Sequence, residues 1–475
     1  MSFISLIFLL FFLIVFLLYS LIEDRFKYIL LLIASYIFYS YWDWRYFPLL
    51  LGSSFIDYYC AQKMGKLETK KQRRPWLWVS LIINLGLLIG FKYWNFIGYN
   101  LNSVLGSHIQ VHDLLLPLGL SFYTLQTLSY SFDIYLGKTK PERHFGYFCL
   151  YVSFFPQLVA GPIERSRRLL PQLKTLTRAT HHQFRYGVLL VIWGFFLKVV
   201  IADNLISFIG SVYFTETLFP FWLYWFVGGL VSFKIYCDFM AYSEIARGLA
   251  LLFGVKLTLN FKRPFLATNI RGFWQRWHIS LTRWIGDYIH IPLLQRFKSY
   301  SGRALVTVFT LCLIGLWHGA SWNFILFGLF HGIITILWTP LADLFRWAFN
   351  FRFSIRQFWG RVILAIVLLL SAPIFYVMDT ETLFSILKSM FDFKTFSTPL
   401  SYDLWKNDSY LLIEALFGIV LLTGYSFMAE YRNTEMVEVF ATSRSIFRWA
   451  IAVVFILLIF MFGNFTNENF TYFEF

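Results

Sequence analysis

The sequence contains few charged residues. Asp, Glu, Lys and Arg together make up 14% of its 475 residues, whereas hydrophobic residues make up 58% and aromatic residues 22%. A soluble chain of this length would carry about 25% charged residues and would divide into two or three domains. The composition therefore excludes an ordinary soluble protein. It predicts an all-α fold, a polytopic bundle of transmembrane helices.

Acidic residues are especially scarce, with 26 Asp and Glu against 41 Lys and Arg, for a formal charge of +15. Such an excess could indicate nucleic-acid binding, but the basic residues have no soluble domain to lie on. In a membrane protein, excess Lys and Arg mark the cytoplasmic loops. We therefore expect the lipid bilayer, and no nucleic acid, as a partner.

Cysteine is also rare, and several catalytic signatures are missing. The four cysteines are dispersed, without CxxC pairs or metal-ligand spacing, which predicts buried structural thiols and no metal site. The sequence has no HExxH, GxSxG, P-loop or GxGxxG motif, and we expect no bound cofactor. Ser2–Ile22 lacks a basic leader and a small-residue cleavage site, so we expect a retained first helix.

Long apolar segments are what the sequence does have, and they predict about 11 membrane spans. The basic loop Lys63–Arg74 is expected on the cytoplasmic side. Phe145–Pro162 lies between two basic stretches, and Phe155-Pro156 and Gly161-Pro162 break it, so we expect it to re-enter the membrane without crossing. We predict one integral membrane domain, 1–475. Its parts are N-terminal spans (1–136), a core with re-entrant and cytoplasmic helices (137–340) and C-terminal spans (341–475).

The least hydropathic long stretch is Asn260–Arg303, with eight basic residues and one acid, Asp287. Within it, Phe273–Tyr288 has helical periodicity, with an aromatic and aliphatic face opposite a polar face. This pattern predicts an interfacial or re-entrant helix on the cytoplasmic side. His278 falls at the edge of its apolar face.

Two histidines lie in the apolar stretch GLWHGASWNFILFGLFHG, residues 315–332. An ionisable group in hydrocarbon is costly and often functional, and histidine transfers protons near neutral pH. His318, followed by small residues, could be a general base or a hydrogen-bonded core histidine, and the residues leave both interpretations open. For His331 we favour a structural hydrogen bond between helices. Asp238, near the end of a long apolar segment, could be paired structurally or active.

Five stretches carry a resemblance to a known family. They are PLGLSFYTLQTLSYSFDIY (117–135), FFPQLVAGPIER (154–165), IYCDFMAYSEIARGLALLFG (235–254), NFKRPFLATNIRGFWQRWHISLTRWIGDYIHIPL (260–293) and LWHGASWNFILFGLFHG (316–332). In sequence and order they resemble the membrane-bound O-acyltransferase (MBOAT) family, in particular its bacterial alginate O-acetylation branch. The resemblance implies a helical bundle with a tunnel, an essential histidine at His318 and a second at His278. Candidate supporting residues are His331, Trp317, Ser321, Asn323 and Asp238.

The resemblance implies an O-acyltransferase, and an O-acetyltransferase in particular. We expect a multi-pass protein of the bacterial inner membrane that passes acetyl from a cytoplasmic thioester, such as acetyl-CoA, across the membrane. The acceptor would be an extracytoplasmic polysaccharide (alginate, peptidoglycan or similar), with a periplasmic acetyltransferase as partner. One alternative is a proton-coupled transporter of polysaccharide or acyl-lipid, which predicts inverted repeats that the sequence does not display. Another is a non-catalytic scaffold of an export complex, for which His318→Ala would leave function intact.

Overall fold

The computed structural model describes residues 1–111, 115–349, 353–400, 402–441 and 445–466. Within these ranges the regular structure consists of helices, with no strand. The expected all-α fold is therefore confirmed.

The chain divides into two compact units. The first unit comprises residues 1–191 and 242–259, and the second comprises 192–241 and 260–475. The division into 1–136, 137–340 and 341–475 stays a prediction. Helices α9 (His181–Phe195) and α11 (Phe221–Leu252) contribute residues to both units.

The other helices of the first unit are α1 (Leu6–Leu21), α2 (Asp24–Ser40), η1 (Trp44–Tyr46), α3 (Phe47–Gly65), α4 (Lys70–Leu88), η2 (Ile89–Tyr93), α5 (Trp94–Leu105), α6 (Leu120–Tyr135), α7 (Phe145–Ser153) and α8 (Ser166–Lys174). The other helices of the second unit are η3 (Phe196–Ala202), α10 (Leu205–Tyr213), η4 (Pro264–Leu266), α12 (Ile270–Arg276), α13 (Ile279–Ile285), η5 (Gly286–His290), α14 (Ile291–Arg296), α15 (Tyr300–His318), α16 (Trp322–Phe349), α17 (Phe353–Tyr376), α18 (Thr380–Met390), η6 (Phe393–Thr395), α19 (Tyr402–Tyr431), α20 (Met436–Ala441) and α21 (Ser445–Phe462).

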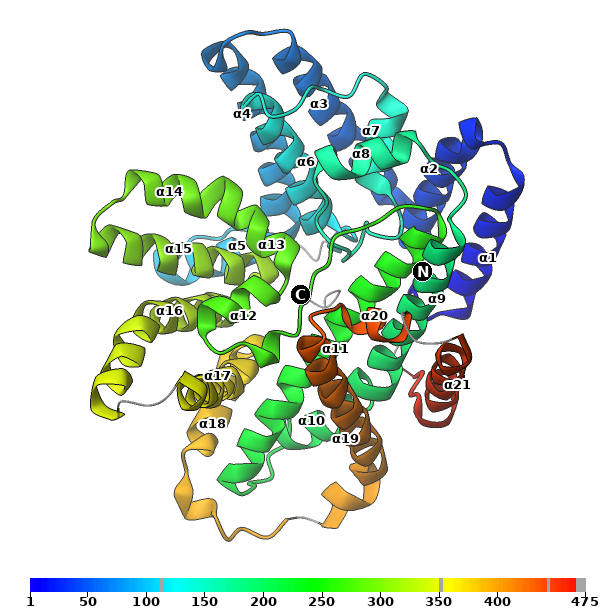
Figure 1. Cartoon of the computed structure of the whole chain (residues 1–475). Coiled ribbons are helices and arrows are strands. Elements are labelled where there is room, and N and C mark those ends of the chain that lie inside the picture. The colour runs from blue at the N-terminus through cyan, green and yellow to red at the C-terminus, as the bar shows by residue number, and fades with distance from the viewer. Residues whose placement is uncertain (112–114, 350–352, 401, 442–444, 467–475) are drawn as a thin grey trace. The chain divides into compact units, whose positions relative to one another are not determined.

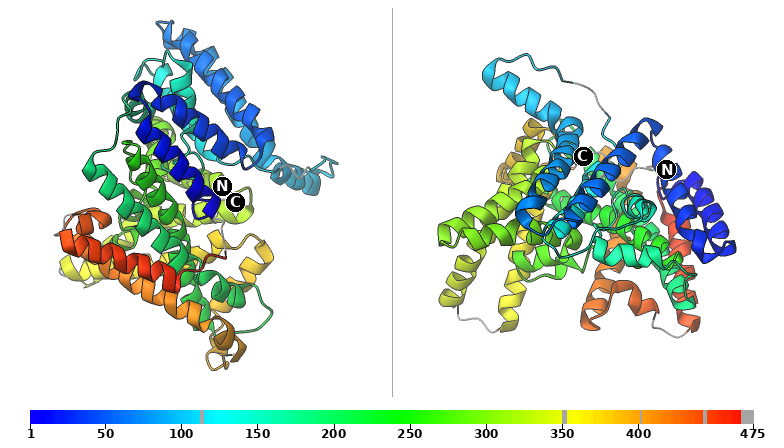
Figure 2. Two further views of the ribbon diagram at one scale, coloured as in Figure 1. Left: turned by 90° about the vertical axis from the view of Figure 1, so that its right-hand side faces the viewer. Right: turned by 90° about the horizontal axis from the view of Figure 1, so that it is seen from above.

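A buried polar cluster joins three helices of the first unit. Helices α3 and α4 form an antiparallel hairpin (Figures 1 and 2). Asp57 on α3 accepts hydrogen bonds from Ser80 Oγ (2.6 Å) and Asn84 Nδ2 (2.9 Å to each carboxylate oxygen) on α4. Thr127 and Ser131 on α6 bond to Asn84 and Ser80 in turn. A carboxylate in an apolar interior is costly unless it is hydrogen-bonded, so this cluster keeps the three helices in register.

Several helices have the length and composition of membrane spans. Among the described residues five qualify, namely Lys70–Leu105, His181–Tyr213, Tyr300–His318, Gln357–Tyr376 and Ser409–Tyr431. Shorter apolar helices are Leu6–Leu21, Trp322–Trp338 and Ile446–Phe462. The total of about 11 spans stays a prediction. In the segment expected to re-enter, α7 has nine residues, or about 14 Å at the rise of an α-helix, which is too short to cross.

The interfacial helix predicted over Phe273–Tyr288 is broken, which corrects the sequence-based expectation. Helix α12 ends at Arg276, and α13 begins at Ile279. Between them His278 takes the left-handed conformation, with φ of 41° and ψ of 55°. The helical period therefore does not continue across this break, and His278, within the break, is buried.

Candidate active site

His318 is the last residue of α15, where the chain turns into α16. The two helices lie side by side (Figure 1). A Cβ added at Gly315 would overlap the backbone oxygen of Phe324, and one at Gly328 would overlap that of Leu311. Glycine at both positions allows this close approach. As a result, the His318 side chain lies in the protein interior, with 5% of its surface exposed.

The break between α12 and α13 places His278. Asn260, itself fully buried, satisfies the backbone of the first turn of α13. Its backbone oxygen accepts the Ile279 N–H at 2.8 Å, and its Oδ1 accepts the Ser280 N–H at 3.3 Å. The first N–H groups of a helix have no partner within the helix, and here Asn260 takes the part of a cap. The anchored turn holds His278 in its left-handed conformation, 1% exposed.

The two histidines expected to be catalytic lie next to each other. The ring centroids of His278 and His318 are 6.3 Å apart, although the residues are forty positions apart in sequence. Trp317 lies edge-on to the His278 ring at 6.0 Å. Phe239 packs on His278 at 4.7 Å, and Phe375 packs on His318 at 5.1 Å. The structure thus places both rings in one aromatic environment, and their catalytic role stays a prediction.

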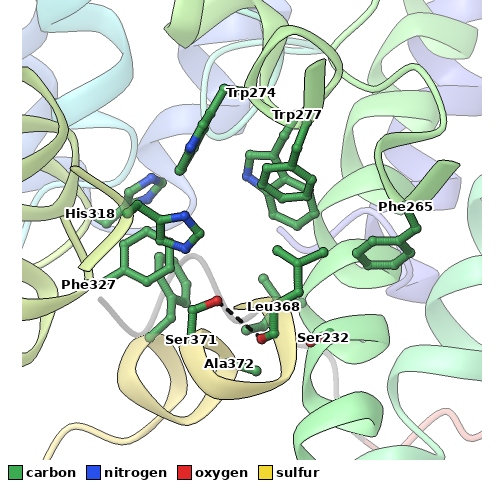
Figure 3. Close-up of a pocket in the computed structure, with 13 residues that line it drawn as sticks. Ser232, Phe265, Trp274, Trp277, His318, Phe327, Leu368, Ser371 and Ala372 are labelled. Carbon is green, nitrogen blue, oxygen red and sulfur yellow. Dashed lines mark hydrogen bonds between the residues drawn. The ribbon is translucent and has the colours of Figure 1, made fainter. Parts of the chain in front are cut away.

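His318 also borders a partly open cavity (Figure 3). The wall is mostly aromatic and aliphatic. It is formed by Ser232, Ile235, Phe265, Phe273, Trp274, Trp277, His318, Phe327, His331, Leu368, Ser371, Ala372 and Phe375. These residues come from α11, the segment Pro264–Trp277, and helices α15, α16 and α17. The cavity therefore offers an apolar chamber with a few polar groups, one of which is the His318 ring.

His331 lies on the wall of the same cavity, fully buried. Its ring is surrounded by Phe327 at 4.5 Å, Trp274 at 5.2 Å and Phe330 at 5.6 Å between centroids. Neither ring nitrogen has a hydrogen-bond partner among the residues that the structure describes. The structural hydrogen bond between helices that we favoured from the sequence is therefore not present in the described part of the chain.

Ser321 and Asn323 fix the start of α16. Ser321 Oγ accepts the N–H of Asn323 at 3.2 Å. The Asn323 amide donates to the backbone oxygens of Val377 at 2.7 Å and Met378 at 3.1 Å, beyond the end of α17. These two candidates are outside the cavity wall and hold the α15–α16 turn against α17. Any effect they have on His318 is therefore a positioning effect.

Asp238 belongs to a buried ionic cluster. Lys198 Nζ lies 2.8 Å from Asp203 Oδ1 and 2.9 Å from Asp238 Oδ1. All three side chains are almost completely buried. Buried charges are tolerated when they are paired in this way. The cluster ties η3 and the residue after it to α11, which favours the paired interpretation of Asp238 over an active one.

The basic stretch Asn260–Arg303 is partly neutralised. Arg263 Nε and Arg276 Nη2 lie 2.6 Å and 3.0 Å from the two carboxylate oxygens of Glu430. The six other basic residues are exposed, namely Lys262, Arg271, Arg283, Arg296, Lys298 and Arg303. Against these six exposed positive charges, the stretch has one exposed acid, Asp287.

His290, outside the membrane-spanning helices, has a different environment. Its Nδ1 lies 3.0 Å from Thr310 Oγ1. Burial, and secondarily the positive charge of Arg271, lowers the pKa of His290. His290 is absent from the cavity wall. In the described residues, no group of three or more His, Cys, Asp or Glu side chains could hold a metal ion.

Sequence reasoning missed several cavity residues. Ser232 on α11 and Ser371 and Phe375 on α17 line the cavity. Ser371 Oγ donates to the backbone oxygen of Leu368 at 3.1 Å (Figure 3). In the sequence these residues lie in ordinary hydrophobic segments, where nothing distinguishes a wall residue from one that faces lipid.

Known proteins resemble this chain over most of its length. The model of the family described as MBOAT, membrane-bound O-acyltransferase, matches residues 142–378, a range that includes His278, His318 and His331. The peptidoglycan O-acetyltransferase of Helicobacter pylori is 34% identical over 390 residues, covering 76% of this chain and 73% of the relative. The chain belongs to the membrane-bound O-acyltransferase family.

Other relatives of the MBOAT family are named for different polymers. The probable alginate O-acetylase AlgI of Pseudomonas putida is 36% identical, covering 74% of this chain and 75% of the relative. The teichoic acid D-alanyltransferase of Bacillus subtilis is 27% identical, covering 55% of this chain and 67% of the relative. The protein is thus a multi-pass membrane O-acyltransferase.

Proposed function

We propose that this O-acyltransferase moves acetyl from a cytoplasmic thioester across the bacterial inner membrane, for O-acetylation of an extracytoplasmic polysaccharide such as alginate or peptidoglycan. The observation that carries the proposal is the pair of buried rings, His278 and His318, at 6.3 Å beside the apolar cavity. Relatives named for alginate and peptidoglycan O-acetylation support the choice of acyl group and acceptor. A periplasmic acetyltransferase would act as partner on the outer side.

The chemistry requires a group that takes up a proton and then returns it. The acceptor hydroxyl gives its proton to His318 as its oxygen forms a bond to the thioester carbonyl carbon. The carbon–sulfur bond then breaks, and the departing thiolate takes the proton from the imidazolium. A second imidazole, His278, whose ring centroid lies 6.3 Å away, can orient the first ring and share its charge during this transfer.

The donor would be drawn to the exposed basic residues of the second unit. Acetyl-CoA carries several negative charges, and a surface of one sign raises the local concentration of an oppositely charged ligand. Arg271, Arg283 and Arg296 are among these exposed basic residues. Attraction of this kind weakens with salt, so the KM for acetyl-CoA should rise with ionic strength.

The test is His318→Ala in a strain that lacks the wild-type copy. We expect polymer O-acetyl content to fall at least a hundredfold at an unchanged level of the protein, because loss of a general base typically costs 10²–10⁴-fold. His181→Ala, an exposed histidine at the start of α9, is the matched control and should acetylate normally. Normal acetylation by His318→Ala would reject the catalytic role and favour a scaffold.

A further inference from the structure

Two side chains that line the cavity, His331 and Trp274, have buried ring nitrogens without a hydrogen-bond partner among the described residues. The two serines of the wall, Ser232 and Ser371, instead donate to backbone oxygens within their own helices. His331 is fully buried, and neither ring nitrogen has a partner among the described residues. A neutral imidazole carries one donor and one acceptor. Buried polar atoms are rarely left unsatisfied, so a ligand is the natural partner.

The wall around His331 restricts what that ligand can be. None of the thirteen described residues of the wall is Asp, Glu, Lys or Arg. The rings of Trp274, Phe327 and Phe330 pack directly on the imidazole. A charged group would lose its hydration here without gaining a counter-charge. An uncharged group that bears a carbonyl, hydroxyl or amide fits the chamber.

His331 and His318 lie at different places on the cavity wall. Phe375 packs on His318 at 5.1 Å and on Phe327 at 5.0 Å, and Phe327 packs on His331 at 4.5 Å. Two aromatic rings thus lie between the imidazoles along this part of the wall. A group held by His331 would be a second point of attachment, which orients the substrate at His318.

We propose that His331 is a substrate-binding residue, which hydrogen-bonds an uncharged carbonyl, hydroxyl or amide of the molecule in the cavity. The inference rests on the proposed function insofar as it takes this cavity as the site of acyl transfer. The uncharged group can come from either of two sources, the acyl donor or the acceptor sugar. A merely structural histidine would instead affect stability and leave substrate binding unchanged.

The experiment uses the full-length protein in lipid nanodiscs and an uncharged donor, S-acetyl-N-acetylcysteamine. Binding is followed by tryptophan fluorescence, since Trp274 contacts His331. Turnover is followed by thiol release with methyl glucoside as a neutral acceptor. His331→Phe removes both ring nitrogens, His331→Gln keeps a donor and an acceptor, and His290→Phe is the control, because His290 is outside the wall and is bonded to Thr310.

For His331→Phe we expect the Kd or KM of one substrate to rise about tenfold, the loss of roughly one hydrogen bond, with kcat changed less than threefold. A change for the thioester identifies the donor, and a change for methyl glucoside identifies the acceptor. His331→Gln should stay within threefold of wild type, as should His290→Phe. The proposal is overturned if His331→Phe alters neither constant, or if both His331 variants fail to accumulate while His290→Phe does.

The fluorescence arm distinguishes failure of this inference from failure of the proposed function. If His318→Ala keeps its transferase activity but His331→Phe loses thioester binding, the binding role stands and the catalytic assignment falls. If His331→Phe binds the thioester as wild type does and also keeps the wild-type KM for methyl glucoside, while His318→Ala is inactive, the catalytic assignment stands and the binding role is rejected.

Discussion

Asp57 in the first unit and His331 in the second are both fully buried polar side chains, yet their surroundings differ. The carboxylate of Asp57 accepts hydrogen bonds from Ser80 and Asn84. The ring of His331 packs on the aromatic rings of Trp274, Phe327 and Phe330, and neither of its nitrogens has a hydrogen-bond partner among the described residues. A polar group that supports the fold is satisfied by the protein itself, whereas one that awaits a ligand is not.

The largest loss of stability is expected in the buried ionic cluster, where Lys198 neutralises Asp203 and Asp238. Lys198→Met would leave Asp203 and Asp238 without the cation that both contact. We expect a loss of about 3–5 kcal/mol of unfolding free energy, the range for breaking a buried ion pair. Unfolding in detergent, followed by tryptophan fluorescence, measures it. The exposed Lys394→Met is the control, and equal stability of the two variants would contradict a satisfied cluster.

A smaller loss is expected for Asp57→Val, which removes the shared acceptor of Ser80 and Asn84. Their hydrogen-bond donors would stay buried, at a cost of about 1–3 kcal/mol. Asp57→Asn keeps an acceptor oxygen and should recover part of this. The same unfolding measurement applies. An Asp57→Val protein as stable as wild type would contradict the role of Asp57 as a polar group that supports the fold.

Asn260 is a buried polar residue that is satisfied by the protein and also supports the candidate active site. Its hydrogen bonds hold the turn at His278, a candidate catalytic residue. Asn260→Ala removes the acceptor of the Ser280 N–H and should cost about 1 kcal/mol of stability. Because it frees the turn at His278, we also expect kcat to fall about tenfold or more with little change in KM. Asn260→Asp retains an acceptor oxygen and should restore kcat. Failure of Asp to do better than Ala would reject this positioning role.

The smallest effect on stability is expected for His331→Phe. The phenyl ring has a similar shape and replaces an imidazole without partners in the described structure. Such a replacement should leave the unfolding free energy within about 0.5 kcal/mol of wild type or raise it. A loss greater than about 2 kcal/mol would show that protein groups do satisfy His331, and would remove the contrast with Asp57.

Much of the fold and part of the site could be predicted from the sequence. The amino-acid composition of a segment indicates whether that segment lies in water or in the lipid bilayer. Few charges and long apolar segments predict membrane helices, and the motif around His318 predicts the family. The break at His278 could not be predicted from periodicity. The stretch keeps its helical pattern, and the bonds that anchor the break come from Asn260, eighteen residues earlier.

By itself, the sequence determined that this is an all-α membrane protein of the O-acyltransferase family with His318 and His278 as candidates. Only the tertiary structure decided that those rings lie together, that Asp238 is paired and that His331 is not, within the described residues. The physical reason is that a local pattern specifies which solvent a segment prefers. Whether a buried polar group finds a partner depends on side chains brought from distant parts of the chain.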